Sequence, residues 1–206
     1  MKNTFSPKDN TAYTILEALI AISVIVTGIF SVLTLTVSSL SVTSSALDYL
    51  VAANLAREGI ELVRNQRDTN WYKEKDFDYM LTNATYYTAV VDYNDVADDG
   101  IGGKDIMFTF IDDDIDDLAC QLHRSNGVYT RDIGSPTSYY RLIYLNHICQ
   151  DISASPVVPT NESVKSNGED CDGETKIGID IVSKVKWLDN KIERTVELNS
   201  RVYDWR

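Results

Sequence analysis

The stretch ILEALIAISVIVTGIFSVLTLTVSSLSVTSSA, residues 15–46, decides how this chain is built. It contains one charged residue, Glu17, and residues 18–47 carry no charge at all. A helix needs roughly 20 apolar residues to cross about 30 Å of hydrocarbon, so the stretch can span a membrane and is too long for a signal peptide. The polar residues before it include Lys2 and Lys8, which predicts that the N-terminus lies in the cytoplasm and the rest of the chain outside.

The helical pattern continues beyond the apolar stretch. In ALDYLVAANLAREGIELVRNQRD, residues 46–68, apolar side chains recur every three or four positions, which is the spacing of an amphipathic helix. The predicted apolar stripe consists of Leu47, Val51, Leu55 and Leu62, with Gly59 on the same face. We therefore expect residues 14–67 to form one helix on the order of 80 Å long, apolar all round in its first half and amphipathic in its second.

From about residue 83 the apolar residues alternate with polar ones, as in β-strands. Strands are predicted at residues 85–93, 105–112, 127–133 and 139–148. Two further strands, IGIDIVSKVKW and KIERTVELNSRVYDW, are separated by Asp189-Asn190, a tight-turn signal, and are expected to form a hairpin. The residues on its predicted apolar face are Ile177, Ile179, Ile181, Val185, Trp187, Ile192, Val196, Leu198 and Val202.

This apolar face needs a cover, and the stripe of the amphipathic helix is the element available. The predicted fold class is therefore α+β, with a long N-terminal helix packed on a C-terminal antiparallel sheet. We expect Trp71, Trp187 and Trp205 to anchor the helix to the sheet.

Composition argues against several classes of function. The 206 residues include 31 Asp and Glu against 19 Lys and Arg, a net charge of -12, whereas nucleic-acid surfaces draw on clustered basic residues. No hydrolase, metalloprotease or phosphate-loop motif is present, so no enzyme activity and no nucleic-acid partner is predicted.

Three acidic segments, residues 92–105, 111–118 and 167–174, offer many oxygen ligands of the kind calcium prefers. None has the spacing of the twelve-residue calcium loop. The first segment gives the candidate ligands Asp92, Asn94, Asp98 and Asp99, and the alternative is a set of solvated acidic loops. No other cofactor is predicted.

The three cysteines, Cys120, Cys149 and Cys171, have no metal-binding spacing. Cys149 and Cys171 flank a polar loop that contains proline, and a domain outside the cytoplasm permits a disulfide. We predict this pair, with three unpaired thiols as the alternative.

The segment AYTILE, residues 12–17, resembles the processing motif of type IV prepilins and of type II secretion pseudopilins. In that family a small residue precedes the cleavage site, and an aromatic residue, threonine, two aliphatic residues and glutamate follow it. The resemblance implies that prepilin peptidase cleaves between Ala12 and Tyr13 and that Tyr13 becomes N-methylated. The family usually has Gly where this chain has Ala12.

The resemblance also implies a role for Glu17. A carboxylate in hydrocarbon must find a partner, and in this family the glutamate is thought to pair with the amino terminus of a neighbouring subunit during assembly. The alternative is a carboxylate that reaches the membrane interface without a partner.

Two further segments, AREGIELVRNQRDTNW after the span and RVYDWR at the C-terminus, look like minor pilins of the V type or the I-type pseudopilin. The implied organisation is a leader (1–12), a transmembrane or filament-core helix (13–46), an amphipathic helix (47–70) and a globular sheet domain (71–206).

The resemblance implies a structural subunit of the cytoplasmic (inner) membrane, with its N-terminus inside, that enters an extracellular filament. Its expected partners are other pilin or pseudopilin subunits, prepilin peptidase and an inner-membrane assembly platform. Two other classes remain open: a single-pass anchored binding or adhesion protein that does not polymerise, and an anchored surface enzyme.

Overall fold

The computed structural model describes residues 11–83, 85–98, 104–151, 162–166, 168–189 and 191–204, and side chains from Ile15 onward. The chain divides into two compact units, Met1–Leu47 and Asp48–Arg206. The division falls where Asp48 introduces the first charge after the apolar stretch.

Helix α1 (Thr11–Tyr72) runs through both units, and η1 (Leu118–Cys120) is a single turn of 3-10 helix. The strands of the described residues are β1 (Thr88–Val90), β2 (Val96–Asp98), β3 (Lys104–Ile106), β4 (Thr109–Ile111), β5 (Gln121–Ser125), β6 (Val128–Thr130), β7 (Ser135–Gln150), β8 (Glu162–Lys165), β9 (Thr175–Asp189) and β10 (Ile192–Tyr203).

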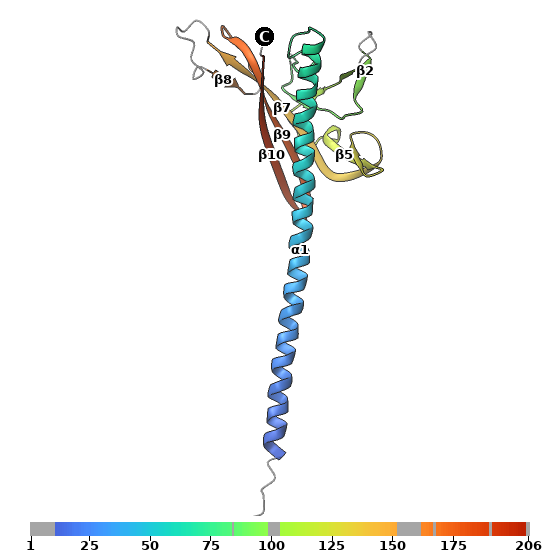
Figure 1. The fold of residues 1–206 in the computed structure, drawn as a ribbon, viewed down its shortest axis with the longest axis vertical. Coiled ribbons are helices and arrows are strands. Elements are labelled where there is room, and N and C mark those ends of the chain that lie inside the picture. Colours follow the sequence, from blue (N-terminus) through green and yellow to red (C-terminus); the bar gives the residue numbers. More distant parts are fainter. Residues whose placement is uncertain are drawn as a thin grey trace, which may run out of the picture. The chain divides into compact units, whose positions relative to one another are not determined.

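The main sheet is antiparallel throughout and has the order β10-β9-β7-β1-β4 (Figure 1). Strand β7 is its centre: one edge pairs with β9, and the other pairs in turn with β5, β1 and β8. Strand β6 extends β5 as a short hairpin, and β2 and β3 form a separate two-stranded sheet.

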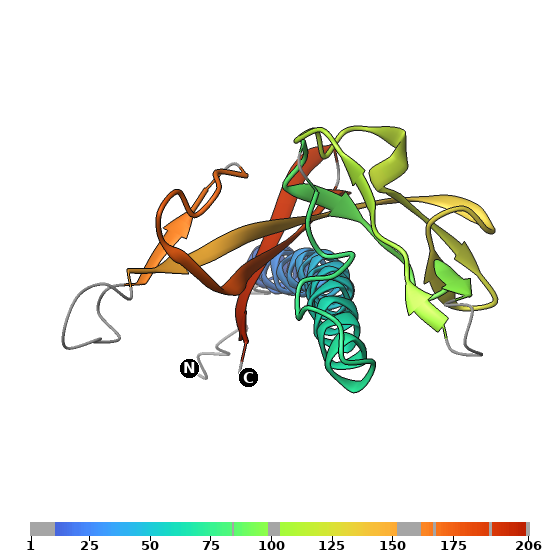
Figure 2. The same cartoon turned by 90° about the horizontal axis from the view of Figure 1, so that it is seen from above.

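The second half of α1 packs on one face of the main sheet, which confirms the predicted α+β fold (Figure 2). Near its start, Ala52, Leu55 and Ala56 form a cluster with Val185 and Trp187 of β9. Further along, a second cluster joins the helix to β7, β9 and β10, through Ile60, Val63, Ile143, Leu145, Ile179, Ile181 and Val202.

The buried stripe of the helix differs from the prediction at its start. Leu55, Gly59 and Leu62 are buried as expected, but Leu47 is 59% exposed and Val51 is half-buried. The buried stripe begins instead at Ala52, which packs in a cluster with Leu122, Tyr139, Val185 and Trp187. The helix is also longer than the predicted 14–67.

The strand predictions were right about the hairpin and about residues 139–148, which lie within β7, and less accurate elsewhere. Residues 85–93 contain the three-residue strand β1, and the region 105–112 holds two strands, since the chain turns at Met107, whose N–H donates to Asp95. Of the residues on the predicted apolar face, Ile192 is 56% exposed and Ile177 is half-buried. Trp71 and Trp187 pack against the helix–sheet core, whereas Trp205 lies outside the described residues.

The helix lies close against the sheet at Gly59. A Cβ atom there would lie 2.6 Å from Ser183 Oγ and 3.1 Å from Ile143 Cδ1. Glycine in a helix interior costs about 1 kcal/mol relative to alanine. Here the missing side chain lets the helix backbone lie directly on β7 and β9.

A buried arginine ties the helix to the sheet beside this contact. Arg141 of β7 donates from Nη1 to the carbonyl of Leu55 (3.1 Å) and from Nη2 to the carbonyl of Val91 (2.6 Å). Its Nη1 also lies 3.4 Å from Glu58 Oε1, on the next turn of the helix. These contacts offset the cost of burying the charge, because a buried guanidinium needs both hydrogen-bond acceptors and a counter-charge.

The end of the helix is fixed by a buried amide network. Gln66 Nε2 donates to Asn70 Oδ1 (2.9 Å), and Gln66 Oε1 accepts from the N–H of Ile106 (2.8 Å). Asn70 Nδ2 donates in turn to the carbonyls of Phe77 and Tyr79. The network therefore holds the turn after the helix and strand β3 in place.

Replacing Gly59 with valine should lower the free energy of unfolding by about 1–3 kcal/mol, because the added atoms overlap Ser183 and Ile143. Urea unfolding in detergent, followed by tryptophan fluorescence, measures the change. Gly28→Val is the matched control, since no heavy atom lies within 4 Å of a Cβ built at Gly28. Equal unfolding free energies for the two variants would contradict the packing described.

Candidate functional site

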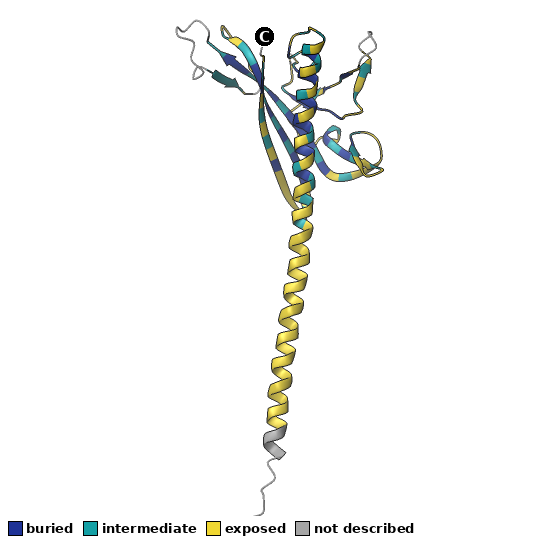
Figure 3. Cartoon of the chain, in the orientation of Figure 1, coloured by how far each residue is buried: buried dark blue, intermediate teal, exposed yellow. Residues whose placement is uncertain are grey.

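The first unit is a helix without a covering partner. Its side chains from Ile15 to Ser44 are all exposed, and they are predominantly large and apolar (Figure 3). Within the described residues, α1 is the one helix long and apolar enough to cross a membrane. A single N-terminal apolar helix of this kind is compatible with a single-pass membrane anchor.

Six of the ten hydroxyl groups between Ile15 and Ser44 bond to the helix itself. These six donate to carbonyls three or four residues earlier at 2.7–3.0 Å, and they belong to Ser23, Thr27, Ser31, Thr34, Thr36 and Thr43. A polar group in hydrocarbon must be hydrogen-bonded, and these bonds need no water and no second chain. The Ser/Thr content of the segment is therefore compatible with a lipid or helix-bundle environment.

Glu17 is the one charged side chain of this segment. It lies on an exposed apolar surface with Leu16, Ile20 and Ala21, and no residue that the structure describes forms a hydrogen bond or ion pair with it. Ala12 and Tyr13, the residues of the predicted cleavage site, lie in α1, but their side chains are outside the described residues.

Three of the candidate calcium ligands, Asp92, Asn94 and Asp98, lie among the described residues. Asp92 is buried, and its Oδ2 accepts from the N–H of Arg131 (3.0 Å), whose guanidinium also pairs with Asp95 (3.3 Å). Burial raises the pKa of Asp95, and the nearby charge of Arg131 opposes that rise. Asn94 and Asp98 are exposed.

Asp99 lies outside the described residues. Across the described ranges, no group of three or more His, Cys, Asp or Glu side chains is placed to hold a metal ion. Among the described residues of this segment, Asp95 pairs with Arg131, and Asp105 pairs with Lys73 and Lys75.

The second acidic segment covers the opposite face of the sheet. Asp113 accepts hydrogen bonds from Tyr87 (2.9 Å) and Tyr144 (2.7 Å), Asp116 pairs with Lys186, and Asp117 caps η1. Burial and the bond to Asp113 raise the pKa of Tyr144. Beneath the segment lies a small apolar cluster of Val90, Cys120 and Leu142. These carboxylates hold the segment over that cluster.

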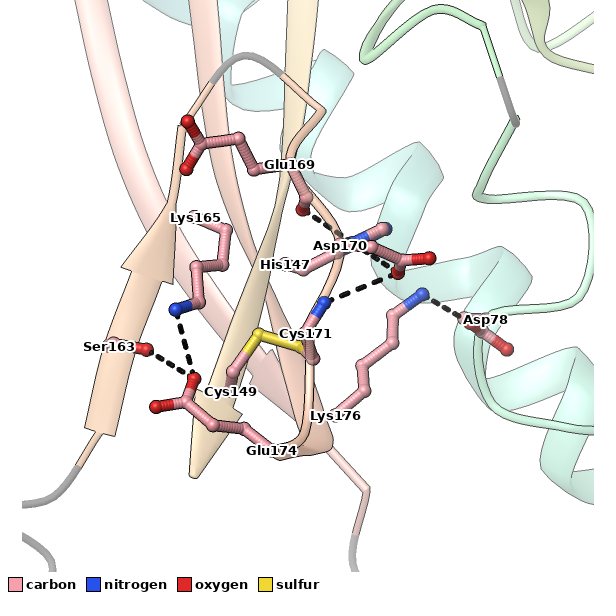
Figure 4. The surroundings of a disulfide bond; sticks show 10 residues. All are labelled: Asp78, His147, Cys149, Ser163, Lys165, Glu169, Asp170, Cys171, Glu174 and Lys176. Carbon is pink, nitrogen blue, oxygen red and sulfur yellow. Dashed lines mark hydrogen bonds and ion pairs between the residues drawn. A yellow bond between two sulfur atoms is a disulfide. The ribbon is translucent and has the colours of Figure 1, made fainter. Parts of the chain in front are cut away.

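A disulfide joins Cys149, at the end of β7, to Cys171, the pair that the sequence favoured (Figure 4). Around it, Glu174 accepts from Ser163 and pairs with Lys165 (both 3.0 Å), which ties the third acidic segment to β8. Lys176 pairs with Asp78 across to the turn that follows α1.

His147 lies beside this bridge, with Nδ1 3.2 Å from the carbonyl of Glu169 (Figure 4). Burial lowers the pKa of His147, and the positive charge of Lys176 lowers it further by a smaller amount. The described residues of the third acidic segment therefore lie beside His147 and include one cysteine of the disulfide.

Cys120 is the free cysteine, and it is 1% exposed. Burial and the surrounding aspartates raise the pKa of its thiol to about 12. A buried thiol of this kind is unreactive, so it packs as a small apolar side chain.

The sequence interpretation missed the polar contacts that position the helix. Arg141 stands alone in an aromatic and apolar strand, which was a signal for a buried charge. The bond from Tyr139 Oη to Asp48 (3.0 Å) had no such signal, because its partners are 91 residues apart.

The chain has no match among the family models, the curated proteins or the solved structures to which it was compared.

Removing the disulfide by the double substitution Cys149→Ala and Cys171→Ala should lower the free energy of unfolding by about 3 kcal/mol, since the bridge closes a loop with a sequence separation of 22. Urea unfolding measures the loss. As a control, a thiol reagent is added to the parent protein without reductant. It should modify no cysteine while the protein is folded, and only Cys120 after unfolding. More than one reactive thiol in the unreduced chain would contradict the pairing.

Proposed function

We propose that this chain is a pilin-like subunit, held in the membrane by residues 13–46 and assembled into a filament through that same helix. In this proposal prepilin peptidase removes residues 1–12, and the sheet domain occupies the outside of the filament. The partners are other pilin or pseudopilin subunits and an inner-membrane assembly platform.

The observation that carries the proposal is Glu17 on an otherwise apolar, uncovered helix surface. A carboxylate packed among apolar helices in a filament needs a partner, because an unpaired charge in an apolar environment is costly. The resemblance of residues 12–17 to the prepilin motif supplies the partner. It is the amino terminus that cleavage frees on a neighbouring subunit.

The remainder of the segment supports a role in a helical bundle. The apolar side chains from Ile15 to Leu40 are exposed on all sides of the helix, so they can contact lipid or several neighbouring helices. Leaving each large aliphatic or aromatic side chain in water instead would cost about 1.5–3 kcal/mol. The hydroxyls that bond back to their own helix place no demand on a particular neighbour.

Within this proposal we favour a minor subunit of the V or I type. The reason is the sequence resemblance of residues 56–71 and of the C-terminal segment RVYDWR to such subunits. Such a subunit works at low copy number in a priming or tip complex. The function is mechanical, and the energy comes from an assembly ATPase.

Replacing Glu17 with alanine should abolish surface filaments while leaving membrane insertion unchanged, because the change removes the counter-charge for a neighbouring amino terminus. Immunoblots of sheared filaments and alkaline extraction of membranes measure the two properties. Ser23→Ala is the matched control on the same helix, since its hydroxyl bonds to its own backbone. Normal filaments in Glu17→Ala would favour an anchored binding protein that does not polymerise.

Processing makes an independent prediction at the N-terminus. Mass spectrometry of the protein from membranes should find a chain that starts at methylated Tyr13. A chain that retains Met1 through Ala12 in the assembled state would refute the proposed route.

A further inference from the structure

One end of the globular unit carries exposed apolar side chains from two elements. Tyr49 and Leu50, on α1, are 57% and 56% exposed, and Leu188 and Ile192, at the turn of the β9–β10 hairpin, are 52% and 56% exposed. The hairpin turn lies beside the helix at this end of the unit (Figures 1 and 3). We call these four residues, together with the exposed Lys191, the basal patch.

The basal patch is held rigidly by the core above it. The ring of Tyr49 lies 6.2 Å from that of Trp187, edge to face, and Trp187 is buried against Ala52 and Leu55. In the hairpin register, Leu188 is opposite Glu193 and Ile192 is opposite Asp189, so the two apolar side chains project from opposite faces of the turn. The patch is therefore a preformed apolar edge.

The carboxylates near the patch already have partners. Asp48 accepts a hydrogen bond from Tyr139, Asp189 lies 3.9 Å from Arg194, and Glu193 lies 3.8 Å from Lys186. Lys191, by contrast, is exposed at the turn. Tyrosine and lysine beside aliphatic residues are typical of the membrane–water interface, where the ring and the ammonium group reach the headgroups.

The length of the uncharged run places this patch at such an interface. Residues 18–47 form 30 residues of helix, about 45 Å at 1.5 Å per residue. A bilayer with both headgroup regions is about 40–45 Å thick, so Glu17 and Asp48 fall at its two boundaries. Tyr49 and Leu50 follow directly, and the hairpin turn packs beside them.

We propose that the basal patch docks into the headgroup region of the same bilayer that residues 15–47 span. The proposal rests on the membrane-held state of the proposed function, before any assembly. Docking requires no second molecule, because the helix tethers the patch to the lipid surface and the association is intramolecular. A bilayer also accepts side chains from both faces of the hairpin turn at once. The globular unit would thus rest on the membrane until the subunit is extracted.

The test uses the full chain in phosphatidylcholine liposomes, at low protein-to-lipid ratio and without prepilin peptidase. A fluorophore is attached at Ile192→Cys. The introduced thiol is the reactive one, because Cys120 is buried and the other two cysteines form the disulfide. The control is the same fluorophore at Tyr72→Cys, which is 89% exposed and about 35 Å along α1 from Tyr49.

Lipids that carry a nitroxide near the headgroup should quench the label at position 192 several-fold more than the label at position 72. The substitutions Leu50→Ser and Leu188→Ser together should reduce the quenching at position 192. Leu118→Ser, which is 76% exposed on η1, should leave it unchanged.

Equal quenching at positions 192 and 72 would overturn the proposal. A second copy of the chain could instead cover position 192. The label there would then become shielded from solvent only as the protein-to-lipid ratio rises, and would stay shielded in detergent. That result would overturn the proposal. Failure of the chain to float with liposomes would overturn both this inference and the membrane-held part of the proposed function. Flotation with equal quenching would overturn this inference alone.

Discussion

The contact between the second half of α1 and the face formed by β7, β9 and β10 is the interaction on which the rest of the structure depends. The sheet has no other described element over most of this face, and the helix would expose its apolar stripe without the sheet. Gly59 sets the distance, since its missing side chain lets the helix backbone approach Ser183 and Ile143. One apolar cluster of this face lies on each side of Gly59 along the helix.

One helix must therefore satisfy two environments. From Ala52 onward its buried stripe matches a protein core, and its polar groups find fixed partners such as Arg141 and the Gln66–Asn70 pair. Up to Leu47, six of its hydroxyls bond back to the helix, and the apolar surface is left for lipid or other helices. Glu17 belongs to neither arrangement, and for that reason it carries the functional proposal.

Many of the acidic side chains form ion pairs or hydrogen bonds with other residues of the chain. Asp105 is buried between Lys73 (2.7 Å) and Lys75 (3.2 Å), and although burial raises its pKa, the two lysines outweigh that effect and lower it. Asp113 holds two tyrosines, and Glu174 holds β8 beside the disulfide. A negative charge of -12 is thus compatible with a well-packed domain, because many of the carboxylates pair with cations or hydroxyl donors within the chain.

The sequence by itself determined the long helix, its change from apolar to amphipathic, and the β9–β10 hairpin, because periodicity reports which faces are buried. It also contained the AYTILE segment and Glu17, whose chemistry is local. Tertiary structure decided where the buried stripe begins, since Ala52 packs in a cluster with Val185 and Trp187 whereas Leu47 is exposed.

Tertiary structure likewise decided that Arg131 contacts Asp92 and Asp95, and that Trp187 lies against Tyr49. These pairings join residues about 40 to 140 positions apart, and alternation along one strand carries no information about which distant segment will lie against it.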